Sequence, residues 1–173
     1  MSIAAKPNTF VSSPLNLSTA RTAIVVTLIA WISASALMDF VIMPGLYVSG
    51  MMSNSGFAAA GDMIFSMFNR VELAAGALVL TGTLLWWALT PGFPGRQSAI
   101  ALASVLFVIP FIYTYGLTPQ MSGLGIQLSL FETAVVPESM DHLHYVYWSF
   151  EVLKLAAGGV LLSWLWNNQP QAV

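Results

Sequence analysis

Long apolar runs separated by short polar stretches dominate the chain. They cover about residues 22–44, 62–89, 97–117 and 142–166. A helix needs about 20 mostly apolar residues to cross a bilayer, and each run is that long. We expect helices because backbone polar groups in lipid must be satisfied within their own segment, and because the runs lack the apolar/polar alternation of barrel strands. The pattern predicts an all-α protein, a polytopic integral membrane four-helix bundle.

Outside this domain of residues 22–166, the pattern predicts a polar N-terminal segment at 1–21 and a tail at 167–173. A second interpretation of the N-terminal region is a signal peptide, with its cleavage site at Ala34-Ser35-Ala36. The apolar run continues beyond that site, and we therefore favour a retained first span.

Proline and aspartate mark the expected ends of the spans. Pro44 and Pro119 predict the ends of the first and third spans, and Asp62 and Asp141 are expected N-caps of the second and fourth. The apolar segment 124–136 fits either a short interfacial helix or an extended loop.

Composition supports a membrane location and excludes several functions. Of the 173 residues, 57% are hydrophobic and 7% are charged, whereas soluble domains carry roughly 25% charged residues. The net charge of −2 provides no basic surface for nucleic acid. The chain has no cysteine, which excludes thiolate metal sites and cysteine nucleophiles. The expected partners are the lipid bilayer and other membrane-protein subunits, with no nucleic acid.

The distribution of basic residues predicts the orientation. Lys6, Arg21 and Arg96 lie in the N-terminal segment and the second connection, whereas the connections at 45–61 and 118–141 contain no lysine or arginine. The positive-inside rule then places both termini in the cytoplasm. We expect a multi-pass protein of a bacterial cytoplasmic (inner) or internal membrane.

Aromatic residues near the span ends predict interfacial belts. The tryptophans expected at the cytoplasmic interface are Trp86, Trp87, Trp164 and Trp166, and the tyrosines expected at the outer one are Tyr113, Tyr115, Tyr145 and Tyr147.

Several polar residues fall inside the predicted spans. The intramembrane polar cluster, whose members are ion-pair or ligand candidates, comprises Asp39, Asn69, Arg70, Glu72, His144, Tyr147, Glu151 and Lys154. With a rise of about 1.5 Å per residue, its five charges reach the outer half of one bundle. A charge at a helix centre costs about 2.5–3.5 kcal/mol, which favours pairing. We expect Arg70 against Asp39 or Glu151, and Lys154 against Glu72 or Glu151.

Two interpretations of this cluster stay open: ion pairs that determine helix register, or a site for an ion, proton or ligand.

The chain contains no nucleotide-binding loop, Ser-His-Asp set or HExxH motif, so we predict no catalytic residues and no enzyme. A carboxylate pair of Glu72 and Glu151 could act chemically, but no motif supports it. His142 and His144 are two residues apart and point in different directions on a helix, so we predict no metal and no cofactor. Haem or copper binding is a weaker alternative.

These observations lead to two hypotheses about function. The first is a non-enzymatic accessory or assembly protein that binds other membrane components. The alternative is a small transporter or an ion/proton-coupling protein that uses the charged cluster.

Short motifs in the spans also carry a family resemblance. They are Trp31 with Phe-Val-Ile-Met-Pro at 40–44, Phe65 and Phe68, Leu-Thr-Pro-Gln-Met at 117–121, and Leu143-His144. The chain resembles the family of four-helix membrane proteins that includes transmembrane protein 205 and bacterial domains of unknown function. In that family the histidine is followed seven residues later by a polar residue, commonly Asn, and this chain has Glu151 there. The resemblance implies a fold and a membrane location rather than a reaction.

Overall fold

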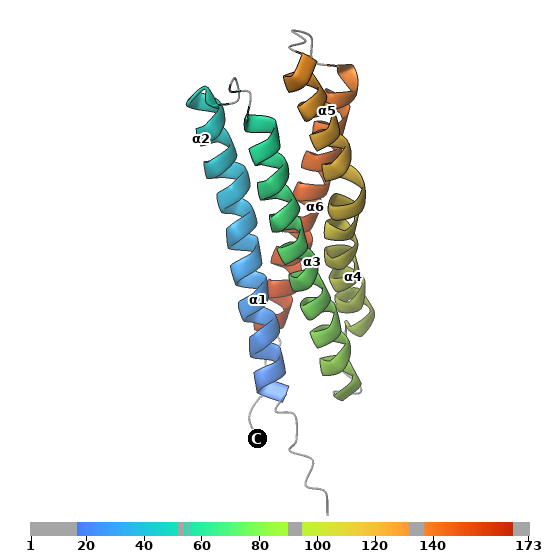
Figure 1. The fold of residues 1–173 in the computed structure, drawn as a ribbon. Coiled ribbons are helices and arrows are strands. Elements are labelled where there is room, and N and C mark those ends of the chain that lie inside the picture. The colour runs from blue at the N-terminus through green and yellow to red at the C-terminus, as the bar shows by residue number, and fades with distance from the viewer. Residues whose placement is uncertain (1–16, 52–53, 55, 90–94, 132–136, 168–173) are drawn as a thin grey trace, which may run out of the picture.

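The computed structural model describes residues 17–51, 54, 56–89, 95–131 and 137–167, and these residues form helices and short turns. The elements in chain order are α1 (Leu17–Leu37), the π-helical turn η1 (Met38–Ile42), α2 (Met43–Val48), α3 (Phe57–Leu89), α4 (Arg96–Ile112), the π-helical turn η3 (Tyr113–Leu117), α5 (Thr118–Phe131) and α6 (Glu138–Asn167). Four continuous long helices result, because α1, η1 and α2 join end to end, as do α4, η3 and α5. Figure 1 shows them side by side, with α2 and α5 at one end of the bundle.

All four long helices in the described part of the chain are long and apolar enough to cross a membrane. They pack in a ring, in which α1 contacts α3, α3 contacts α4, α4 contacts α6, and α6 contacts α1. The predicted all-helical architecture is therefore confirmed for the described residues.

The helices continue through both prolines at which the first and third spans were expected to end. Pro44 lies in the first turn of α2 and Pro119 in the first turn of α5, and neither ends its helix. Proline has no N–H, and its ring clashes with the carbonyl four residues earlier in a regular α-helix. A π-helical turn precedes each proline, η1 before Pro44 and η3 before Pro119. Its wider hydrogen-bonding pattern lets the helix continue through the proline.

The second and fourth long helices also begin earlier than predicted. α3 begins at Phe57, so Asp62 lies inside it, and α6 begins at Glu138, so Asp141 lies in its first turn. Alanines 58–60 are strong helix formers and extend α3 toward its start. The segment 124–136, for which a helix and a loop were both considered, is helical up to residue 131, and its remaining residues lie outside the described part of the chain.

The core changes character along the bundle. At the end of the bundle where α1 begins and α6 ends, the core is apolar and includes Leu28, Val79, Leu161 and the tryptophans Trp86 and Trp87. Both tryptophans are buried against Trp164 and do not face lipid, so the belt prediction is wrong for Trp86 and Trp87, whereas Trp166 of the same predicted belt is 59% exposed. The polar side chains described below lie nearer the middle of the helices. The outside is rich in exposed apolar side chains, as a lipid-facing surface requires.

Candidate functional site

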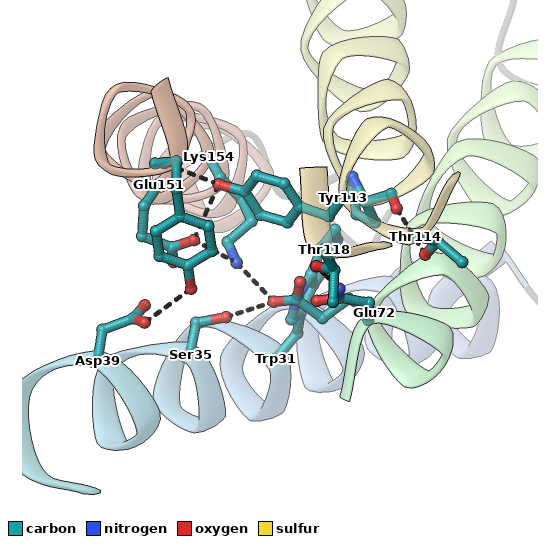
Figure 2. A network of polar contacts seen from close by, with 12 residues as sticks. Trp31, Ser35, Asp39, Glu72, Tyr113, Thr114, Thr118, Glu151 and Lys154 are labelled. Atoms are coloured by element: carbon teal, nitrogen blue, oxygen red, sulfur yellow. Dashed lines mark hydrogen bonds and ion pairs between the residues drawn. The ribbon is translucent and has the colours of Figure 1, made fainter. Parts of the chain in front are cut away.

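Lys154 of α6 connects two carboxylates inside the bundle. Its Nζ lies 2.5 Å from Glu72 Oε1 of α3 and 2.8 Å from Glu151 Oε2 of its own helix. The side chains of Lys154, Glu72 and Glu151 are 4%, 1% and 0% exposed. Figure 2 shows the ammonium between the helices. Because a buried ion costs several kcal/mol of desolvation, such a group persists only when its partners are close and well aligned.

Glu72 receives two further hydrogen bonds, both from the first long helix. Trp31 Nε1 donates to Glu72 Oε1 at 2.9 Å, and Ser35 Oγ donates to the same oxygen at 2.8 Å. Trp31 and Ser35 are four residues apart, so they share one face of α1. With Lys154, the Glu72 carboxylate has three donors, which is a suitable environment for an ionised group.

Two tyrosines extend the network toward Asp39. The Tyr113 hydroxyl lies 3.2 Å from Glu151 Oε2 and 3.1 Å from the Tyr147 backbone carbonyl, and it can donate to either. The Tyr147 hydroxyl donates to Asp39 Oδ1 at 2.9 Å. The two rings stack with centroids 5.0 Å apart, and the Lys154 ammonium lies 5.5 Å from the centre of the Tyr113 ring. The network therefore includes residues from all four long helices.

Both π-helical turns carry a residue of this network. Asp39 belongs to η1 and Tyr113 to η3, and both side chains are buried. A π-helical turn inserts one residue into a helix and changes the direction of the side chains around it, and such turns are frequent at functional sites. The prolines and the site are therefore structurally linked, because the turns that accommodate Pro44 and Pro119 contain Asp39 and Tyr113.

Two carboxyl oxygens of the network are buried without a hydrogen-bond partner among the described residues. They are Asp39 Oδ2 and Glu151 Oε1. Both carboxyl groups belong to the network through tyrosine hydroxyls, Asp39 through Tyr147 and Glu151 through Tyr113. Figure 2 shows the Asp39 carboxylate directed toward α6, which carries Glu151. Buried polar atoms in folded proteins nearly always have a partner, so this pair requires an explanation.

The predicted cluster is only partly assembled. The structure brings Asp39, Glu72, Tyr147, Glu151 and Lys154 together. Asn69 is also buried, and its Nδ2 donates to Thr118 Oγ1 at 2.6 Å, so it bonds outside the carboxylate network.

Arg70 and His144 lie outside the network. Arg70 is exposed on the outer surface of α3, so its expected pairing with Asp39 or Glu151 is wrong. His144 is exposed, and its Nδ1 lies 2.9 Å from the Met140 carbonyl of its own helix.

Sequence reasoning missed three members of the network: Trp31, Ser35 and Tyr113. Tyr113 was expected in an interfacial belt, but the π-helical turn and its contact with Tyr147 place it in the interior. The i, i+4 spacing of Trp31 and Ser35 was the available signal, since both can donate from one helix face.

The described residues place no group of three or more His, Asp or Glu side chains where they could hold a metal ion. Comparison of the chain with protein-family models, curated proteins and solved structures found no match. The family resemblance therefore stays a prediction.

Proposed function

We propose that this chain is a small proton-coupled membrane protein in which Asp39 and Glu151 share one proton at the centre of the bundle. The observation that carries the proposal is that two buried carboxyl oxygens of this network, Asp39 Oδ2 and Glu151 Oε1, have no hydrogen-bond partner among the described residues. A carboxylate is only an acceptor, whereas a protonated carboxyl group also donates. One shared proton therefore gives each of these oxygens a hydrogen-bond partner.

The charge balance of the network supports a bound proton. The network contains three buried carboxyl groups, those of Asp39, Glu72 and Glu151, and one ammonium, that of Lys154, which contacts Glu72 and Glu151. Two unit charges of like sign repel by about 4 kcal/mol at about 4 Å with an effective dielectric constant near 20. A proton on one of two adjacent carboxyls removes this repulsion, as in other carboxyl pairs that share a site.

The number of donors indicates which carboxyls hold the proton. Glu72 has three donors on one oxygen. Within the described part of the chain, Asp39 has one donor, the Tyr147 hydroxyl, and Glu151 is bonded only through Oε2. Donors stabilise the ionised form of a carboxyl group. The proton therefore belongs to the Asp39–Glu151 pair, and Glu72 remains the anion that balances Lys154.

Loss of this proton would change the charge of a network that joins all four long helices. A change of charge in a low-dielectric interior alters which helix packing is stable. We propose that proton release to water is coupled in this way to a conformational change or to transport. The role is non-enzymatic, and both termini lie in the cytoplasm if the positive-inside rule holds for Arg21 and Arg96.

The bound proton is tested with the purified full-length protein in lipid vesicles, by infrared difference spectroscopy during a pH titration. We expect the C=O band of a protonated carboxylic acid, which disappears in Asp39→Asn. The asparagine amide can donate to Glu151 as the shared proton does, so the fold is retained. Asp62→Asn is the matched control, because Asp62 accepts from Ser66 on its own helix outside the network. A band that is absent, or that persists in Asp39→Asn, would refute the shared proton.

Coupling is tested separately in vesicles that contain a pH-sensitive dye, after a pH gradient is imposed. We expect the wild-type protein to dissipate the gradient faster than Asp39→Asn and Glu151→Gln. If all three match protein-free vesicles, the coupling proposal is wrong.

The accessory or assembly function is a second proposal. It rests on a different observation, the exposed charge of Arg70.

A further inference from the structure

The exposed side of α3 carries a charge in an otherwise apolar surface. This surface, the Arg70 face, consists of Met63, Met67, Arg70, Val71, Ala74 and Leu78, all exposed. Their spacing of three and four residues places them along one side of the helix. Met63, Val71 and Leu78 are 65%, 65% and 64% exposed. Arg70 makes no hydrogen bond or ion pair with the described residues.

Arg70 lies near mid-height of its helix. It is about 20 Å along the axis from Phe57, where α3 begins, and about 28 Å from Leu89, where α3 ends. The hydrocarbon core of a bilayer is about 30 Å thick, so a membrane centred on α3 encloses this position. Charged residues at such depth almost always face a bundle interior and pair with another group. Glu72, two residues away, does so, whereas Arg70 faces outward.

The chemistry of the face indicates the kind of partner. A guanidinium in an apolar environment binds a carboxylate through two parallel hydrogen bonds. The methionines Met63 and Met67 adapt to irregular surfaces, and the small Ala74 permits close approach of another helix. A second copy docked by two-fold symmetry through this face would bring the two Arg70 charges near each other, and the face contains no acidic residue to balance them.

We propose that the Arg70 face is an interface for a transmembrane helix of another membrane protein, which carries an aspartate or glutamate at the depth of Arg70. The proposal is independent of the proton site, because Arg70 takes no part in that network. It specifies the interface for the accessory or assembly function.

The test uses a synthetic leucine-rich transmembrane helix with one central aspartate, and the same helix with leucine there. Energy transfer from the labelled full-length protein to each helix is measured in vesicles of zwitterionic lipid. Interhelical polar contacts imply that the aspartate helix binds the wild-type protein about threefold to twentyfold more tightly than the leucine helix. Arg70→Leu should abolish the difference. Equal binding of both helices to the wild-type protein would overturn the proposal.

A relocated arginine is the matched control. Val152 is 64% exposed on α6, at a similar distance from its helix start. We expect the double variant Arg70→Leu/Val152→Arg not to recover preference for the aspartate helix. Full recovery would show that any exposed arginine suffices, and would overturn the assignment to α3.

Two further readouts test other occupants. Arg70-dependent energy transfer between copies of the protein would assign the face to self-association. Arg70-dependent enrichment of anionic lipid, with no preference for the aspartate helix, would assign it to a phosphate headgroup. Either result would overturn the proposal.

Discussion

Replacement of Lys154 by methionine should destabilise the bundle strongly. The substitution removes the ammonium that lies 2.5 Å from Glu72 and 2.8 Å from Glu151, and it preserves an unbranched side chain of similar length. Exposed ion pairs contribute about 0–1 kcal/mol. Removal of one partner of a buried pair costs about 3–5 kcal/mol, because a charge remains without compensation in the interior. With both carboxylates at most 1% exposed, we expect the larger value for Lys154→Met.

The free energy of unfolding can be measured in mixed micelles, by raising the fraction of a denaturing detergent and following tryptophan fluorescence. The informative comparison includes Glu72→Gln and the double variant Glu72→Gln/Lys154→Met. We expect the double variant to be more stable than Lys154→Met alone, because its glutamine leaves no uncompensated charge at position 72. This non-additivity measures the coupling between the two side chains.

Two results would refute this reasoning. One is a loss below about 1 kcal/mol in Lys154→Met, the range of a solvated pair. The other is strict additivity of the two substitutions, which would show that Lys154 and Glu72 do not interact in the folded protein.

The same unfolding assay tests two further contacts. A Cβ at Gly76 would lie 3.0 Å from the Leu106 carbonyl oxygen, so Gly76→Ala should push α3 from α4 and lower the free energy of unfolding by about 1–3 kcal/mol. Gly159→Ala is the control, because a Cβ there meets open space, and it should be neutral or slightly stabilising. Equal effects of the two substitutions would contradict the close packing at Gly76. Asn69→Leu removes the donor to Thr118 and should lower the free energy of unfolding by about 1–3 kcal/mol, because the buried Thr118 hydroxyl loses its partner. The double variant Asn69→Leu/Thr118→Val should lose less, because it leaves no unpaired hydroxyl; an equal or greater loss would contradict this reasoning.

The helical periodicity allowed part of the site to be predicted. Asn69, Glu72 and Gly76 share one stripe of α3 and are all buried. In α6, Glu151 and Lys154 are three residues apart and lie on one buried face. Where several polar or small residues repeat with the helical period, the pattern thus indicates the side that faces the interior.

The ends of the helices and the π-helical turns could not be predicted in this way. Proline indicates a break in a local pattern, but whether a helix stops or continues through a π-helical turn depends on the packing around it. The same limit applies to Tyr113, whose position in η3 decides that it faces Glu151.

The amino-acid sequence by itself determined the class of this protein, since apolar runs long enough to cross a bilayer and few charges leave little choice but a helical bundle in lipid. Only the tertiary structure decided which charges meet. Arg70 and Glu72 are two residues apart, and thus about 200° apart around the helix axis. The helical pattern indicates that Glu72 lies on the inward side of α3, but it does not tell whether Arg70 reaches a carboxylate of another helix or faces outward. The rotation of α3 about its axis is set by close contacts such as that of Gly76 with α4, and it places Glu72 inside and Arg70 outside.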